Sequence, residues 1–196
     1  LCAQAVSFTA ILRDDGSADD TPALLAAQCH QDARFRLSST SGVHLGAVGG
    51  FFALMREAAD SSAPVALCDQ DDIWKPNKVA LCLKALEKAD FVVTDAVITD
   101  AEGRETHASF FKERGIHRSW LGNIVKFGFL GCLFAFKSSV RDKALPFPKR
   151  RNLCTHDNWL FLVGKTFFKV AVLDTPLVCY RRHGGNTSFG SEYAGT

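Results

Sequence analysis

Three carboxylates lie within four positions of the sequence, at Asp69, Asp71 and Asp72. They follow the apolar run 65–68, whose length suits a buried strand. Like charges at a strand end repel one another, and a hard divalent cation offsets them because it prefers oxygen ligands. The alternative is an acidic turn in solvent, which is the ordinary explanation of a charge cluster by itself. Because the cluster lies between a buried strand and the aromatic residue Trp74, we favour a metal site.

Carboxylates also follow two other apolar runs. Asp14 and Asp15 come shortly after the run 8–12, and Asp95 comes directly after the run 91–94. In open α/β sheets, ligands bind beyond the carboxyl ends of the strands. We therefore expect one cleft to collect all three groups of acidic residues.

The composition is that of a globular protein of 196 residues, with 47% hydrophobic and 22% charged residues, which excludes a disordered chain. The net charge of +2 argues against a nucleic-acid partner. The basic run 149–151 fits a solvated loop or contact with an anionic membrane surface. The apolar stretch 120–136 contains Asn123 and Lys126, so we do not expect it to span a membrane.

The seven cysteines are scattered and contain no C-x-x-C pair. They fit buried free thiols in a reducing compartment, which favours a cytoplasmic location. Cys154 and His156 lie close in sequence, but no second pair completes a zinc site.

Strands and helices alternate through the first half of the chain, which is typical of an α/β fold with a mostly parallel central sheet and helices on its faces. The expected strands are 8–12, 35–37, 65–68, 91–94, 131–136, 169–173 and 176–180. The expected helices are 21–30, 51–58, 79–88, one from 138 and one at 156–164. Leu1 to Gln4 resemble the middle of a helix, so we expect an upstream strand to be missing.

Five segments in order resemble the family-2 glycosyltransferases with a GT-A fold, especially the bacterial rhamnosyltransferase-like branch. These segments are DDGSADDT at 14–21, CDQDDIWKPNK at 68–78, GCLFAF at 131–136, THDNWL at 155–160 and PLVCYRRHGGN at 176–186. The resemblance implies inverting transfer of a sugar from a nucleoside-diphosphate donor to an acceptor hydroxyl, with Mg²⁺ or Mn²⁺. It implies one domain over 1–196, with a nucleotide-binding half at about 1–100 and an acceptor and catalytic half at about 101–190.

The same resemblance implies that Asp69 and Asp71 bind the metal, with Asp71 as the direct ligand. It also implies that His183 is a further metal ligand. The metal would neutralise the charge that develops on the leaving diphosphate. Asp72 would contact the sugar or cap the following helix. Trp74 would stack on a sugar or pack against the sheet.

For the nucleotide, the resemblance implies that Asp15 reads the base edge, with Asp14 as a second candidate. A carboxylate can accept the imide N–H of uracil or thymine, so the donor would be UDP- or dTDP-linked. The alternative for both residues is a tight turn before a helix. Arg181 and Arg182 would bind the diphosphate, and their alternative is a solvated basic loop.

Asp157 matches the family's catalytic base, which takes the proton of the acceptor hydroxyl. By itself it would be an ordinary residue of a helix start, and His156 before it is expected to be structural. The chain departs from the family at Gly50, where relatives often carry Asn.

The implied acceptor is a glycan or a lipid-linked glycan of bacterial cell-surface polysaccharide synthesis, reached from the cytoplasm at the inner face of the plasma membrane. The aromatic segment 110–136 could face it. Two other functions stay open. One is an inactive, truncated module that binds sugar nucleotides or glycans. The other is a haloacid-dehalogenase-type phosphatase, which also places D-x-D after a strand.

Overall fold

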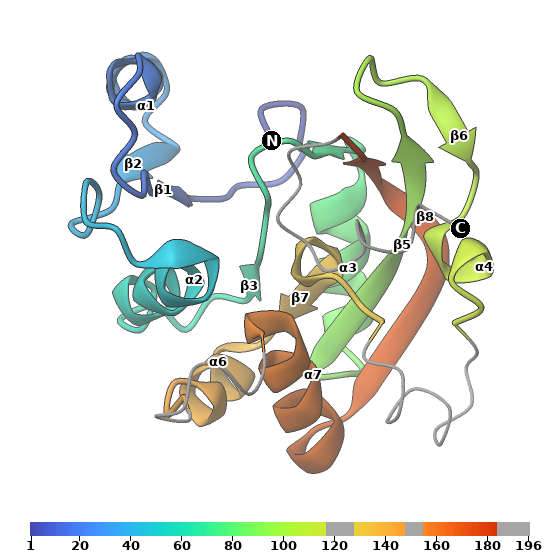
Figure 1. Ribbon diagram of the computed structural model, residues 1–196. Helices are drawn as coiled ribbons and strands as arrows, with labels where there is room; N and C mark the ends of the chain where they lie inside the picture. The colour runs from blue at the N-terminus through green and yellow to red at the C-terminus, as the bar shows by residue number, and fades with distance from the viewer. Residues whose placement is uncertain (117–127, 148–154, 184–196) are drawn as a thin grey trace.

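The structure is a computed structural model that describes residues 1–116, 128–147 and 155–183 (Figure 1). Its larger sheet has the strand order β3–β7–β5–β8–β4, and β6 pairs with the last residues of β5. These strands are β3 (Val65–Ala66), β4 (Ile73–Trp74), β5 (Phe91–Thr99), β6 (Glu105–His107), β7 (Phe134–Phe136) and β8 (Val170–Arg181).

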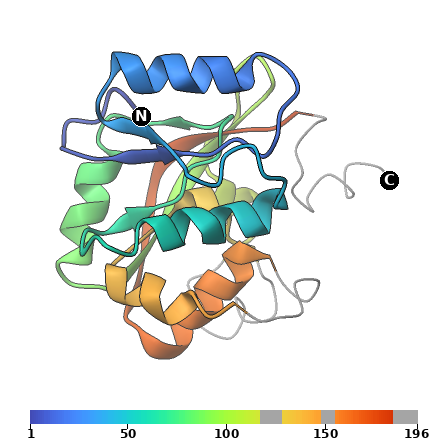
Figure 2. The ribbon, with the colours of Figure 1, turned by 90° about the vertical axis from the view of Figure 1, so that its left-hand side faces the viewer.

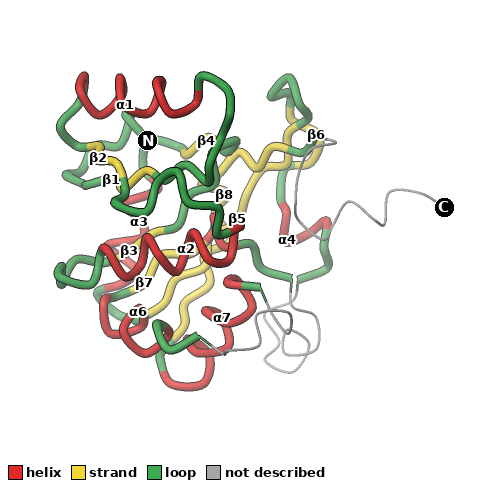
Figure 3. Tube along the Cα trace, turned by 60° about the vertical axis from the view of Figure 1, so that its left-hand side comes forward, coloured by secondary structure: helices red, strands yellow, loops and turns green. Residues whose placement is uncertain are grey.

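A second, two-stranded sheet is formed by β1 (Ala10–Leu12) and β2 (Phe35–Leu37), which run parallel. Helix α1 (Thr21–Gln31) connects them, and α2 (Gly46–Glu57) follows β2. Figures 2 and 3 show α1 at one end of the molecule and α2 between the small sheet and the α6–α7 region. Within the described residues β1 pairs with β2 and β3 pairs with β7, so the two sheets stay separate.

The remaining helices cover the larger sheet. They are α3 (Lys78–Leu86), α4 (Phe110–Glu113), the 3₁₀ helix η1 (Gly131–Leu133), α6 (Ser138–Ala144) and α7 (His156–Phe167). Figure 1 shows α7 and α3 on opposite sides of β5. The predicted α/β class is therefore confirmed.

The expectation of a mostly parallel central sheet is wrong. Only β5 and β8 run parallel in the larger sheet, and the other pairings among the described strands are antiparallel. Parallel neighbours need a crossover of a dozen or more residues. The six residues that separate β3 from β4 are too few for this, and β4 pairs instead with β8.

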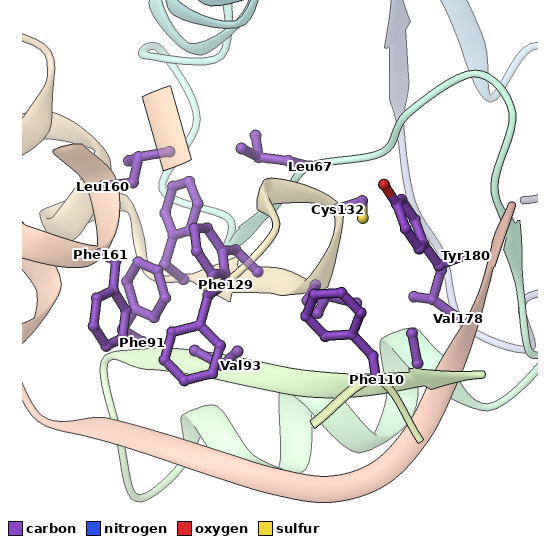
Figure 4. Packing of buried hydrophobic residues seen from close by; sticks show 14 of the residues in the cluster. Leu67, Phe91, Val93, Phe110, Phe129, Cys132, Leu160, Phe161, Val178 and Tyr180 are labelled. Carbon is purple, nitrogen blue, oxygen red and sulfur yellow. The ribbon is translucent and has the colours of Figure 1, made fainter. Parts of the chain in front are cut away.

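Strand β5 organises the core because all nine of its residues are buried. Phe91 and Val93 pack in the larger apolar cluster with α7, while Val92 packs on the other face with Cys82 and Leu86 of α3. This alternation is the two-residue period of a strand. Figure 4 shows the ring of Phe91 among other aromatic side chains of the larger cluster.

Several expected element boundaries changed, and the strand expected at 131–136 is the 3₁₀ helix η1 followed by the short strand β7. The two strands expected at 169–173 and 176–180 are one strand, β8, whose register with β5 shifts opposite Thr94 and Asp95. The strand expected at 91–94 continues to Thr99, so Asp95 lies inside β5 and not at its end. The Asp95 carboxylate accepts hydrogen bonds from Ser109 Oγ (2.5 Å) and from the amide of Phe111 (3.0 Å). Asp95 therefore stabilises the start of α4. The expectation that it shares one cleft with the other acidic residues is wrong.

Candidate active site

The acidic loop at residues 69–72 joins β3 to β4, next to the end of β8. One side-chain atom each of Asp69, Asp72 and Cys132 lies within 4.8 Å of the other two. Burial, reinforced by the charges of Asp72 and Asp157, raises the pKa of Asp69 to about 6. Carboxylates in this environment do not form an ordinary exposed turn.

Asp72 is tied to two other parts of the chain. Its Oδ1 accepts a hydrogen bond from the backbone amide of Arg181 (3.2 Å), and its side chain is also hydrogen-bonded to Cys132. Complete burial raises the pKa of the Cys132 thiol well above its usual value, so this thiol is a donor to Asp72 and a poor metal ligand. Asp72 does not cap the next helix, as one alternative had it, because α3 begins at Lys78 after Asn77.

Close to the acidic loop lies a fully buried lysine, Lys78, and burial lowers the pKa of its side chain. Its Nζ donates a hydrogen bond to the carbonyl of Cys132 (2.6 Å) and lies 3.9 Å from the ring centre of Trp74. Trp74 is itself buried and packs in the core. This agrees with the predicted role of packing against the sheet. The sequence analysis missed Lys78. Its spacing to Cys82 and Leu86 was the available signal, since these three residues form the buried face of α3.

Two of the predicted metal ligands are in contact. His183 Nε2 lies 3.0 Å from Asp71 Oδ2, although 112 positions separate them in the sequence. Arg181 and Arg182 precede this histidine at the end of β8, where their backbone amides bond to Asp72 and to the carbonyl of Thr99. The end of β8 therefore places Arg181 and Arg182, the predicted diphosphate-binding residues, beside the acidic loop.

This arrangement fits a divalent cation. The Oδ2 atom of Asp72 is buried and has no hydrogen-bond partner within the described residues, and Asp69 carries a strongly perturbed carboxyl group beside it. Carboxylate and imidazole groups from Asp69, Asp71 and His183 are suitable ligands for Mg²⁺ or Mn²⁺. Among the described residues, the ligand atoms found within 4.8 Å of one another are those of Asp69, Asp72 and Cys132, while Asp71 and His183 form a separate pair at the same loop and strand end.

Four polar groups lie close to the carboxylate of Asp15. It accepts hydrogen bonds from the amides of Leu45 (2.7 Å) and Gly46 (2.9 Å) at the start of α2, and it pairs with Arg13 (2.6 Å) and His44 (2.9 Å). Burial by itself raises the pKa of Asp15, but these amides and Arg13 outweigh it and the pKa is lowered. A carboxylate offers about four acceptor positions. A nucleobase would therefore have to displace one of these groups, and the exposed His44 is the most accessible.

Asp14 forms the tight turn that was the alternative for this segment. Its Oδ2 accepts hydrogen bonds from the amides of Gly16 (2.9 Å) and Ser17 (3.0 Å). The hydrogen bond from the Ser17 side chain is the main cause that lowers the pKa of Asp14. The turn role of Asp14 is thus present, whereas Asp15 binds the start of α2, and base recognition stays a prediction for both residues.

The departure at Gly50 has a structural reason. A Cβ atom at this position would lie 3.0 Å from Nη1 of Arg13. The guanidinium of Arg13 donates to Asp15, to Thr40 Oγ1 (3.1 Å) and to the carbonyl of Val43. Arg13 therefore fills the space that a larger residue at position 50 would need.

The predicted base, Asp157, lies in the first turn of α7. Thr155 caps this helix, as expected, with its hydroxyl accepting from the amide of Asn158 (3.4 Å). Asp157 Oδ1 lies 2.6 Å from Nε2 of His156. A Cβ atom on Gly131 would lie only 3.1 Å from the same oxygen, so η1 passes directly beside the carboxylate.

The raised pKa of Asp69 predicts a pH dependence of stability in metal-free protein. Between about pH 4 and 6 the folded protein holds a proton on Asp69 that the unfolded chain releases, so stability falls as the pH rises through this window. We expect Asp69→Asn to remove this loss, and to be more stable than the unmodified protein by about 3 kcal/mol at pH 7.

Urea denaturation with a chelator at several pH values measures this difference. Asp60→Asn is the matched control, since Asp60 is an exposed carboxylate in the turn after α2. A difference between Asp69→Asn and the unmodified protein that does not change from pH 4 to 7 would contradict the assignment.

Comparison with known proteins identifies the family. Residues 1–145 match the family described as glycosyl transferase family 2. A curated protein of Nostoc sp. (strain PCC 7120), described as an uncharacterized glycosyltransferase, is 22% identical over 191 residues, which cover 94% of this chain and 58% of that protein.

The fold is that of solved glycosyltransferases. A crystal structure of S. aureus TarS 1-349 superposes with a TM-score of 0.66 at 16% identity, over 91% of this chain and 53% of that one. A second S. aureus TarS structure gives 0.64 at 13% identity, over 92% of this chain and 32% of that one. The chain thus spans about half the length of the relatives it matches. The predicted GT-A fold is confirmed, the phosphatase alternative is not supported, and the chain belongs to glycosyl transferase family 2.

Proposed function

We propose that this chain carries out metal-dependent, inverting transfer of a sugar from a nucleoside-diphosphate donor to an acceptor hydroxyl. One observation supports this most strongly. In η1, Gly131 lies against Asp157, and the next residue, Cys132, is hydrogen-bonded to Asp72. The proposed base and the acidic loop therefore flank the same turn of chain. Their charges act on one another, since Asp157 contributes to the raised pKa of Asp69.

In this proposal Asp157 accepts the proton of the acceptor hydroxyl while the oxygen attacks the anomeric carbon of the donor sugar. Asp157 lies in the first turn of α7, so its side chain is at the N-terminal end of that helix. The bond from the sugar to the diphosphate breaks, and the configuration of the anomeric carbon inverts because attack and departure occur on opposite faces.

Asp69, Asp71 and His183 would hold the divalent cation, which when bound neutralises charge on the leaving diphosphate. Arg181 and Arg182 add positive charge at the same strand end. Together these residues would orient the diphosphate across the end of β8.

The remaining assignments follow the family resemblance. Asp15, with Asp14 as the second candidate, would select a UDP- or dTDP-linked donor. A hexosyl donor, rhamnose among the possibilities, and a glycan or lipid-linked glycan acceptor would place the reaction in bacterial cell-surface polysaccharide synthesis. We propose a cytoplasmic enzyme that contacts the inner face of the plasma membrane peripherally. In the described part of the chain, no helix has the length and apolar character needed to cross a bilayer.

Calorimetric titration of UDP and dTDP, with and without Mn²⁺, tests the donor site. We expect Mn²⁺ to strengthen binding, and we expect Asp71→Ala to weaken binding in Mn²⁺ by about tenfold or more, because the contact with His183 no longer has a carboxylate. The affinity of this variant should then be the same with and without the metal.

Asp100→Ala is the control, since this carboxylate pairs with Arg104 in the β5–β6 turn and lies outside the proposed site. Metal-dependent binding that survives in Asp71→Ala would remove Asp71 from the metal site. Binding without any turnover, in the presence of candidate acceptors, would favour the alternative of a non-catalytic module.

A further inference from the structure

We propose that His156 is a positioning residue for Asp157, and that its imidazole holds the carboxylate in the orientation that accepts the acceptor's proton. The sequence analysis expected only a structural role for this histidine. The proposal rests on the proposed function, because it takes Asp157 to be the base. It adds a second residue to the proton-accepting part of the site.

The contact between the two side chains is short and shielded. His156 Nε2 lies 2.6 Å from Asp157 Oδ1, and the two side chains are only 11% and 20% exposed. Consecutive residues of a helix do not normally face one another. The contact therefore needs the imidazole to be held across the start of α7 by neighbouring elements.

Two neighbours hold the imidazole in this position. The ring of Phe51 in α2 stacks on it, with ring centres 4.3 Å apart and an angle of 23° between the planes. At Gly131 in η1, a Cβ atom would lie 2.9 Å from His156 Nε2. Gly131 does not have a positive φ angle, so its backbone conformation does not demand glycine. What the site requires there is the absence of a side chain.

The polar atoms of the ring point to the same conclusion. His156 Nδ1 is buried and makes no hydrogen bond within the described residues. The contact of the ring with Asp157 is made by its other nitrogen, Nε2. Asp157 Oδ1 is also buried and makes no hydrogen bond within the described residues, so its 2.6 Å approach to Nε2 is a close contact and not a formed hydrogen bond. Catalytic hydrogen bonds are often poorly aligned without substrate and tighten in the complex. With Oδ1 held by His156, Oδ2 is the oxygen that meets the acceptor.

Two substitutions separate positioning from packing. His156→Phe keeps a flat ring against Phe51 but removes the N–H donor, whereas His156→Gln keeps a donor amide and removes the ring. Turnover is measured as nucleoside diphosphate released from UDP-glucose, UDP-N-acetylglucosamine and dTDP-rhamnose, with water as the acceptor. Binding of UDP with Mn²⁺ and thermal unfolding are measured on the same samples.

We expect His156→Phe to lower kcat by about ten- to a hundredfold, with the donor KM and the affinity for UDP unchanged. His156→Gln should recover most of this loss. Equal turnover in His156→Phe and the unmodified protein would overturn the proposal. So would a loss that follows the melting temperature in both variants.

Imidazole nitrogen NMR gives a readout that does not depend on turnover. We expect the neutral ring of His156 to carry its proton on Nε2, and we expect Asp157→Asn to alter the Nε2 signal while Asp60→Asn leaves it unchanged. A ring protonated on Nδ1 would overturn the positioning role even if Asp157 is the base. The opposite failure is also recognisable. If His156 carries its proton on Nε2 but Asp157→Asn keeps full turnover, then the contact exists and Asp157 is not the base, so the proposed function has failed.

Discussion

The Asp157→Asn variant is expected to lose turnover by about 10²- to 10⁴-fold while it keeps its affinity for nucleoside diphosphates. Asparagine preserves the size of the side chain but cannot accept a proton at neutral pH. Donor binding should survive because the Asp71–His183 pair and the cations at the end of β8 are untouched.

Release of nucleoside diphosphate measures turnover, and calorimetry with UDP and Mn²⁺ measures donor binding. Asp60→Asn is the control, since Asp60 is an exposed carboxylate in the turn after α2. Turnover retained within a few-fold in Asp157→Asn would require a different base. Loss of binding and turnover together would instead indicate that Asp157 supports the donor site.

The second large effect concerns stability. Phe91 is fully buried at the start of β5, and its ring packs against Phe134, Phe136 and Phe161 at centre distances of 4.9, 5.5 and 6.4 Å. Gly164 of α7 approaches so closely that a Cβ atom there would lie 2.7 Å from the Phe91 ring. We expect Phe91→Ala to lower the free energy of unfolding by about 3–5 kcal/mol, because it leaves a cavity between the sheet and α7.

Urea denaturation monitored by tryptophan fluorescence measures this loss. Phe167→Ala is the matched control, since Phe167 lies on the same helix as Gly164 with 59% of its surface exposed, and we expect a change below about 1 kcal/mol. Similar losses in the two variants would mean that β5 is not the centre of the core. A loss large enough to unfold α7 would also remove Asp157 from the site, so turnover should fall with stability in Phe91→Ala.

One contact between predicted site residues could be anticipated from the sequence. Motifs placed Asp71, His183 and Asp157 in roles that need them close together, and Asp71 and His183 are indeed in contact. The cap at Thr155 followed from local chemistry, because a hydroxyl before an apolar helix satisfies a free amide. Such local signals need no knowledge of the rest of the chain.

Strand pairing could not be predicted in the same way. Alternating strands and helices suggested parallel neighbours, yet β4 and β7 pair antiparallel with strands far away in sequence. A run of apolar residues shows that a strand is buried but not which strand lies beside it. Asp95 illustrates the same limit, since the sequence could not show that β5 continues beyond it.

Buried charge was equally hidden. The sequence signal for the burial of Lys78 was its helical spacing to Cys82 and Leu86, which is weak for a charged residue, and the packing of α3 against β5 and β7 shows the burial directly. The four polar groups around Asp15 come from residues 13 and 44–46, which the fold brings together across a 30-residue separation. Residues that are distant in sequence but close in the fold decide whether a carboxylate is free to bind a ligand. A local sequence motif does not identify these neighbours.

The enclosed side chain of Lys78 bears on the charge balance of the acidic loop. Its Nζ donates a hydrogen bond to the Cys132 carbonyl. Burial lowers the pKa of Lys78 and outweighs the opposing charge of Asp72, so this lysine is not a permanent counter-ion for the loop. In the proposed function, the divalent ion would therefore supply a counter-charge that the fold itself does not guarantee.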